Sequence, residues 1–112
     1  MIRFTNGPAA GVPGLLLRRA PLYLRVVCHD GKWDALDQLD DRPEPGETIY
    51  AYRLVEQQGS VHINRGRRGS GFFVMATYTV VEPQPADATM RNNACWREWA
   101  ETKAKAGEAR CE

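Results

Sequence analysis

Residues 71–82, GFFVMATYTVVE, constrain the fold more than any other run, because their apolar side chains fall on both faces of an extended strand. One face would carry Phe72, Val74, Ala76, Tyr78 and Val80, and the other Phe73, Met75, Thr77, Thr79 and Val81. A strand that is apolar on both faces is central in a sheet or is covered on its second face by another element. The run therefore predicts a sheet that another part of the chain covers.

The C-terminal third of the chain can supply this cover. Two prolines are followed by Asp87, which stands in a position suited to cap a helix, and by a helix-permissive run. Cys95, Trp96 and Trp99 fall on one helical face, where the two indole rings can cover a large apolar area of a sheet. We expect a helix over about 87–105 and a polar tail, 106–112, that frays.

Shorter extended runs fill the first two thirds of the chain, separated by turn-sized segments. These runs are MIRFT (1–5), LYLRVV (22–27), TIYAYRLV (48–55) and VHIN (61–64), with an Asp-Gly turn in HDGK and a further turn at EQQGS. In LYLRVV, Leu24 and Val26 alternate with Arg25 and Val27, as in a half-buried strand. The spacings leave no room for the crossovers of a parallel sheet.

These patterns predict an α+β fold: a small antiparallel β-barrel or strongly bent sheet of about five to six strands, with one C-terminal helix packed on it. The 112 residues are expected to form a single domain, strand-rich over 1–82.

Charge and cysteine content limit the class of protein. Fifteen Lys and Arg against fourteen Asp and Glu leave a net charge of +1, without the basic excess of a dedicated DNA-binding domain. Three cysteines with no CxxC spacing indicate free thiols, and therefore a cytoplasmic or other intracellular location, with a virion as an alternative. The opening residues lack the apolar run of a signal peptide, and no apolar run is long enough for a membrane span.

The most unusual stretch is acidic, WDALDQLDDRPEPGE (33–47). Its carboxylates are Asp34, Asp37, Asp40, Asp41, Glu44 and Glu47, against a single Arg42. It can be interpreted as a solvated loop, as a docking surface for a basic or nucleic-acid-binding protein, or as a site for a hard cation, although its spacing does not match an EF-hand. Trp33 at its start is expected to be partly exposed, as an interface anchor would be.

A basic stretch, NRGRRGSGFF (64–73), supports a second interpretation. Arg65, Arg67 and Arg68 on a glycine-spaced loop could contact phosphates, with Tyr50 and Tyr52 offering rings for base stacking. The alternative is a hairpin connection that happens to be basic. If Arg18 and Arg19 lie beside this loop, the arginines would form a patch facing away from the acidic stretch and would polarise the surface.

No pattern predicts catalysis. His29 follows Cys28 directly, and adjacent residues on a strand point to opposite faces, so the two do not form a nucleophile and base. GRRGSG lacks the ending and spacing of a phosphate-binding P-loop. We therefore expect a protein that is not an enzyme, with no cofactor and no bound metal.

Stretches such as KWDALDQLDD, PGETIYAYR and WREWAE resemble those of compact proteins encoded by phages and mobile elements, in style and without a shared motif. This resemblance implies a viral protein, either a virion component or an inhibitor of a host system, and assigns no role to any residue. The sequence thus predicts an interaction protein that docks through the acidic loop, with a small-barrel nucleic-acid-binding protein as the alternative.

Overall fold

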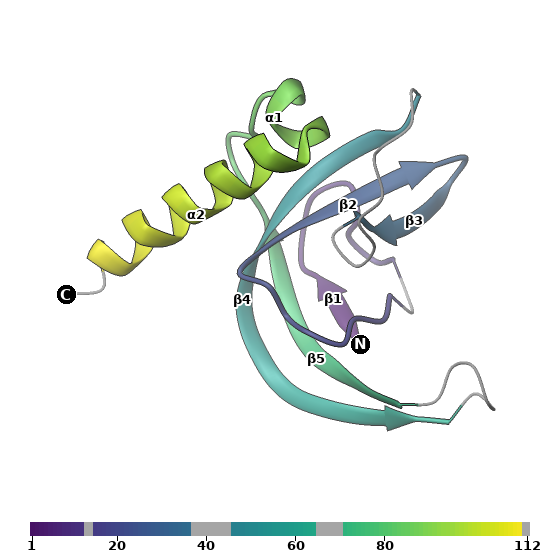
Figure 1. Ribbon diagram of the computed structural model, residues 1–112. Helices are drawn as coiled ribbons and strands as arrows, with labels where there is room; N and C mark the ends of the chain where they lie inside the picture. Colours follow the sequence, from purple (N-terminus) through teal and green to yellow (C-terminus); the bar gives the residue numbers. More distant parts are fainter. Residues whose placement is uncertain (13–14, 37–45, 65–70, 111–112) are drawn as a thin grey trace.

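The computed structural model describes residues 1–12, 15–36, 46–64 and 71–110, with side chains to residue 106. Within them the chain forms a five-stranded sheet, bent into a half-barrel, and two C-terminal helices (Figure 1). The elements are β1 Ile2–Phe4, β2 Tyr23–His29, β3 Lys32–Ala35, β4 Thr48–Ile63, β5 Gly71–Val80, α1 Asp87–Arg91 and α2 Asn93–Arg110. The α+β class and the strongly bent sheet are confirmed.

The sheet has the strand order β1-β5-β4-β2-β3. Its pairs are antiparallel except that β1 runs parallel to β5, with Ile2 opposite Ala76. The expectation of an entirely antiparallel sheet is therefore wrong. The residues after β1 form a long connection, which lets the chain return to the far side of the sheet before β2 begins.

The turn expected at Asp-Gly is confirmed. β2 and β3 form a hairpin whose two linking residues, Asp30 and Gly31, have φ angles of 51° and 78°. Positive φ at both positions gives a tight turn whose twist matches that of the strands, and Asp and Gly tolerate it well.

β4 corrects a second expectation. TIYAYRLV and VHIN are not two strands joined by a turn, because one strand runs from Thr48 to Ile63 and pairs with β5 along most of its length. Its register shifts between Leu54 and Glu56 and again between Gln57 and Gly59. Each bulge adds one residue and increases the local twist, so the polar EQQGS stretch bends the strand instead of reversing it.

The concave face of the sheet holds the larger core. The buried members of this core are Ile2, Phe4, Ala9, Leu15, Leu17, Leu24, Val26, Ala35, Tyr52, Val74, Ala76 and Tyr78. They come from all five strands and from the segment between β1 and β2. The alternation expected in β2 is confirmed, since Leu24 and Val26 face this core, and Tyr52 of β4 faces it as well.

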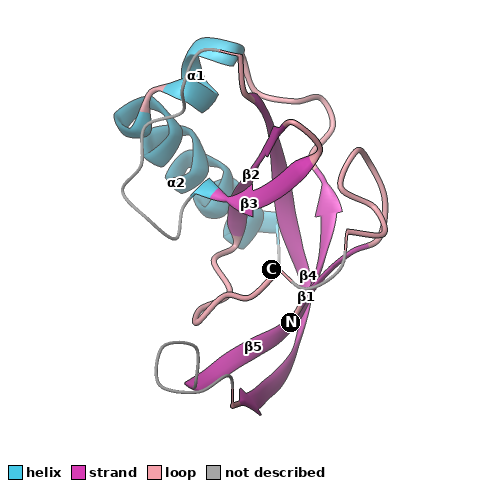
Figure 2. Ribbon diagram, turned by 90° about the vertical axis from the view of Figure 1, so that its right-hand side faces the viewer, coloured by secondary structure: helices cyan, strands magenta, loops and turns pink. Residues whose placement is uncertain are grey.

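The helices pack on the other face of the sheet (Figures 1 and 2). There Val27, Ile49 and Ala51 pack with Met90 and Trp96, and the ring of Trp99 stacks on that of Trp96. The two tryptophans therefore close a core as expected. They cover β2 and the start of β4, whereas Met75 in the middle of β5 is 41% exposed.

The helical region differs from the expected single helix over 87–105. Ala86 occupies the N-cap of α1 without a side-chain hydrogen bond, so Asp87 does not cap the helix as expected. Asn92 has extended backbone angles that separate α1 from α2, and its Oδ1 accepts a hydrogen bond from Cys95 N at 3.0 Å. Cys95 is exposed instead of packed beside the tryptophans, and α2 continues to Arg110.

Two tyrosine hydroxyls attach the long N-terminal connection to the sheet. Tyr52 Oη donates to Asn6 O and accepts from Ala9 N, both at 2.9 Å. Tyr78 Oη donates to Pro21 O at 2.5 Å. The connection thus lies across the mouth of the half-barrel, facing the β2–β3 hairpin, and this placement forms the site described next.

Candidate docking surfaces

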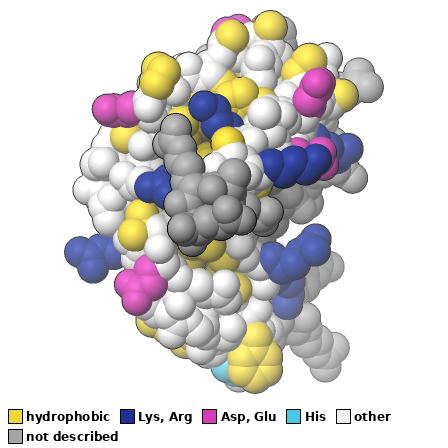
Figure 3. Space-filling view, turned by 90° about the vertical axis from the view of Figure 1, so that its left-hand side faces the viewer, with side chains coloured by type: hydrophobic (Ala, Val, Ile, Leu, Met, Phe, Trp, Pro, Cys, Tyr) yellow, Lys and Arg dark blue, Asp and Glu magenta, His cyan; other side chains and the backbone are white. Residues whose placement is uncertain are grey.

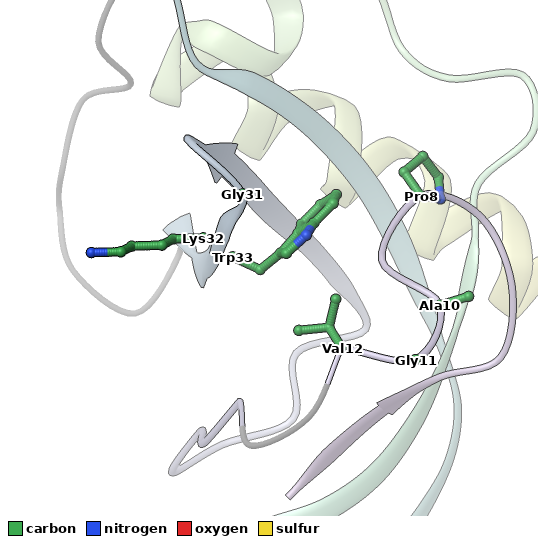
Figure 4. A pocket seen from close by; sticks show the side chains of 7 residues that line it. All are labelled: Pro8, Ala10, Gly11, Val12, Gly31, Lys32 and Trp33. Atoms are coloured by element: carbon green, nitrogen blue, oxygen red, sulfur yellow. The ribbon is translucent and has the colours of Figure 1, made fainter.

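An open hollow lies between the N-terminal connection and the β2–β3 hairpin (Figure 4). It has a volume of about 660 Å³ and is lined by Pro8, Ala10, Gly11, Val12, Gly31, Lys32 and Trp33. Volumes of this order are typical of sites that accept side chains or small ligands. We refer to these seven residues as the β3 hollow.

Trp33 forms the largest wall of the β3 hollow. Its indole ring is half-buried and lies 5.8 Å from the ring of Tyr50, measured between centroids. In Figure 4 the ring extends toward Pro8, with Val12 below it, while the Lys32 side chain points away. No residue in the described part of the chain accepts a hydrogen bond from the indole nitrogen. The partial exposure expected of Trp33 is therefore observed.

The edge of β3 beside the hollow is partly closed to strand addition. Asp34 is exposed, and its Oδ1 accepts a hydrogen bond from Ala35 N at 2.8 Å. This bond removes one of the backbone donors that an added strand would need. A partner at this edge would therefore depend mainly on side-chain contacts in the hollow.

Only the ends of the acidic stretch are described. Asp34 is exposed and Glu47 is half-buried, whereas Asp37, Asp40, Asp41 and Glu44 lie outside the described residues. Thr48, where β4 begins, pairs with Cys28, which pairs with Trp33 on its other side. β3 therefore ends at Ala35, in the cross-strand row of Val26 and Tyr50, and β4 begins in the row of Trp33.

The basic stretch connects the far ends of β4 and β5, but Arg65, Arg67 and Arg68 themselves lie outside the described residues. Next to it, Phe72 is 66% exposed, and its ring meets that of His62 edge-on at 4.9 Å between centroids. Phe73 is 7% exposed, so the two phenylalanines differ in exposure as their alternation predicts.

Arg18 belongs to the same end of the molecule. Its guanidinium carbon lies 4.9 Å from the centroid of the Phe73 ring. It also contacts Gly71 so closely that a Cβ there would lie 2.6 Å from Arg18 Nη1. Arg18 is thus placed beside Gly71, within the basic stretch, while the arginines of that stretch lie outside the described residues.

The two tyrosines proposed as stacking platforms have different environments. Tyr50 is half-buried beside Trp33, at the other end of β4 from the basic stretch. Tyr52 has no exposed surface, and burial raises the pKa of its hydroxyl. The ring of Tyr52 is therefore not available to a base, and its role is to hold the N-terminal connection.

Arg25 is a feature that the sequence patterns did not reveal. It is 4% exposed within the helix–sheet interface, where it hydrogen-bonds to Met90 O and Asn93 Oδ1. The sequence could have indicated this role, because Arg25 shares its face of β2 with Val27. An arginine on a face that a helix covers needs a hydrogen-bonding partner.

Cys28 and the two histidines lie in different environments. Cys28 is half-buried, and His29 is exposed and lies 3.2 Å from an oxygen of Asp30 on the turn. His62 contacts Phe72 at the far end of β4. In the described part of the chain, no three His, Cys, Asp or Glu side chains gather as metal ligands would.

No described helix combines the length and apolar character needed to cross a bilayer.

Coloured side chains of both charge signs lie on the helix-bearing face. In Figure 3 the basic and acidic side chains that are coloured are interspersed across this face. The β3 hollow and the end of the β4–β5 hairpin therefore remain the two candidate docking surfaces.

Comparison with protein-family models, with curated proteins and with solved structures finds no match to this chain.

Proposed function

We propose that this chain is a non-enzymatic interaction protein that docks on a basic partner protein through the β3 hollow. The observation that carries the proposal is the half-buried Trp33, held against Tyr50 in the wall of an open hollow. Tryptophan and tyrosine contribute a large share of binding energy when they sit in preformed pockets. A rigid indole wall loses little conformational entropy when a partner binds.

Charge favours a basic partner. Asp30 and Asp34 are exposed beside the hollow, and the sequence between Asp34 and Glu47 contains four further carboxylates against one arginine. Such a concentration of negative charge accelerates encounter with a positively charged surface and disfavours acidic partners. The partner could itself be a nucleic-acid-binding protein, since these carry basic surfaces.

The setting of this interaction is part of the proposal. Cys28 and Cys95 are free thiols, which suits a reducing, cytoplasmic environment. The resemblance of KWDALDQLDD and related stretches to phage-encoded proteins suggests two roles, a virion component or an inhibitor of a host system. In either role the acidic surface would engage a protein and not a small substrate.

Site-specific photocrosslinking tests the proposal. A photoreactive phenylalanine analogue replaces Trp33 in one variant and the exposed Glu98 of α2 in a matched control. We expect position 33 to crosslink to a segment rich in Lys and Arg, with a yield that falls as salt rises. Crosslinks of equal yield from both positions, or to an acidic segment, would contradict the proposal.

A charge-reversal variant distinguishes the contribution of the acidic stretch to docking from that of the hollow. Replacing Asp37, Asp40 and Asp41 by lysine should reduce crosslinking from position 33 while leaving the circular dichroism spectrum unchanged. An unchanged yield would remove the acidic stretch from the docking surface.

One observation favours nucleic acid as a second candidate partner. Phe72 and Arg18 lie at the end of the β4–β5 hairpin, and Arg65, Arg67 and Arg68 come shortly before Phe72 in the sequence. The sequence contains no Asp or Glu between Gln57 and Val81. An exposed ring among arginines is suited to stack on a base of a single strand.

Oligonucleotide titrations test this candidate. Phosphate contacts by these arginines should give a slope of about −0.7 per contact in log K against log salt for a single strand. Phe72→Ala and Arg67→Ala should weaken binding, whereas Arg53→Ala, at an exposed position of β4, should not. No binding at low salt would reject nucleic acid.

A further inference from the structure

The two candidate docking surfaces lie at opposite ends of β4. Trp33 belongs to the cross-strand row of Thr48 at the start of the strand, and Phe72 pairs with His62 near its end. Thr48 and His62 are 14 residues apart along β4, which is bent, in a molecule that extends 40 Å along its longest axes. Figure 1 shows β3 near one end of the curved β4–β5 pair, with the end of β4 and the start of β5 at the other.

The hairpin tip presents an apolar ring together with positive charge. We define the tip by Arg18, His62 and Phe72. The Phe72 ring is 66% exposed and supported on one side by His62, and Arg18 lies against Gly71, the residue before Phe72. An exposed phenylalanine with its edge braced by a neighbour is suited to insert into a pocket on another molecule.

The β3 hollow has the complementary character. Its lining combines the apolar side chains of Pro8, Val12 and Trp33 with polar surface that includes Lys32, and its volume of about 660 Å³ can take an aromatic side chain. The exposed carboxylates Asp30 and Asp34 lie on the same hairpin as Trp33. An aromatic group that carries a cation beside it fits this combination.

We propose that the occupant of the β3 hollow is the hairpin tip of a second copy of this chain. The proposal rests on the function proposed above, because it uses the same hollow and names its partner. Opposite charge at the two ends attracts copies head to tail, and the net charge of +1 opposes association very little. Because the tip and the hollow are different surfaces, each copy keeps one unused end after a single contact, and assembly can continue.

Complementary variants test this arrangement. Phe72→Ser removes the inserting ring, and Ala10→Arg fills the hollow with bulk and positive charge. Both residues are exposed, so both variants should fold as the wild type does. Trp33→Ala is a second hollow variant that removes the aromatic wall instead of filling the space. Sedimentation velocity is measured at low and at high ionic strength over a range of protein concentrations.

We expect the wild type to form dimers and larger species whose proportion rises with concentration and falls with salt. Phe72→Ser and Ala10→Arg should each weaken association by about thirtyfold, the loss typical of one central interface side chain. An equimolar mixture of these two variants should form a 1:1 complex and nothing larger, because it contains one intact tip and one intact hollow.

A wild type that stays monomeric at low salt and high concentration would overturn the proposal. So would a mixture that associates no more than its two components, or variants that associate as the wild type does. If the wild type is monomeric but position 33 still crosslinks to a basic protein, self-association fails and the proposed function stands. If neither is observed, both fail.

Discussion

The guanidinium group of Arg25 lies over the indole ring of Trp96, with its central carbon 5.2 Å from the ring centroid. The same group donates hydrogen bonds to Met90 O at 2.8 Å and to Asn93 Oδ1 at 3.0 Å. Arg25 therefore contacts the end of α1, the start of α2 and the inward face of α2 from a single position on β2. This cluster fixes how the helices lie on the half-barrel.

Replacing Arg25 by methionine should destabilise the protein by about 2–3 kcal/mol, because Met90 O and Asn93 Oδ1 lose a charged donor in a place that water does not reach freely. Urea denaturation followed at 222 nm measures the change. Arg53→Met is the matched control, since Arg53 is exposed on β4, and it should stay within about 0.5 kcal/mol of the wild type. Equal effects of the two substitutions would show that Arg25 does not anchor the helices.

The hydroxyl of Tyr52 should also contribute to stability. Tyr52→Phe leaves Ala9 N and Asn6 O without their partner, and we expect a loss of about 1–3 kcal/mol at neutral pH. Tyr50→Phe serves as the control, because the contact of Tyr50 with Trp33 is made through its ring. A Tyr52→Phe variant as stable as this control would contradict the assignment.

The raised pKa of Tyr52 predicts how stability depends on alkaline pH. Burial favours the neutral phenol, so the folded state holds this proton more tightly than the unfolded state, whose pKa is near 10.0. The stabilisation is complete below pH 10 and is lost as pH rises above it. Thermal melts between pH 9 and 11 should therefore decline more steeply for the wild type than for Tyr52→Phe. Parallel declines would argue against the linkage.

The sequence predicted the parts of the fold that depend on alternation and on tight turns. Leu24 and Val26 face one core and Val27 the other because a strand changes side at each residue, and Asp30-Gly31 specifies its turn locally. The helical cover by Trp96 and Trp99 followed from their spacing. These features need no information from distant parts of the chain.

Other features depend on contacts between distant residues, and the sequence did not predict them. β4 continues through EQQGS because pairing with β5 stabilises two bulges there. The local propensity of these residues alone predicts a turn. β1 is parallel to β5 because the connection held by Tyr52 and Tyr78 returns across the sheet. The β3 hollow likewise exists only because residues 8–12 are brought beside Trp33, and only Trp33 of its lining had been singled out.

Gly7 and Gly11 offer a matched pair in that same connection. Both have positive φ, 73° and 81°, which disfavours a side chain at either position. A Cβ at Gly7 would also lie 2.7 Å from Tyr52 Oη and 2.9 Å from Val80 Cβ, whereas a Cβ at Gly11 would meet nothing within 4 Å. Gly11→Ala should therefore cost about 1 kcal/mol and Gly7→Ala at least about 2–3 kcal/mol. Denaturant titration distinguishes the two, and equal losses would mean that the contacts at Gly7 relax freely.

Trp96 and Trp33 have different roles: Trp96 stabilises the fold, whereas Trp33 is available to a partner. Trp96 is 4% exposed and packs against Arg25, Trp99 and the sheet, so Trp96→Ala should cost about 3–5 kcal/mol. Trp33 is half-buried at the edge of the sheet with one face open to the hollow, so Trp33→Ala should cost about 1–2 kcal/mol and leave the helices in place. Urea denaturation compares the two variants, and crosslinking or sedimentation of the folded Trp33→Ala protein measures what its indole contributes to binding. If Trp33→Ala lowers the free energy of unfolding as much as Trp96→Ala does, Trp33 is a core residue. The proposal that its ring is available to a partner would then be contradicted.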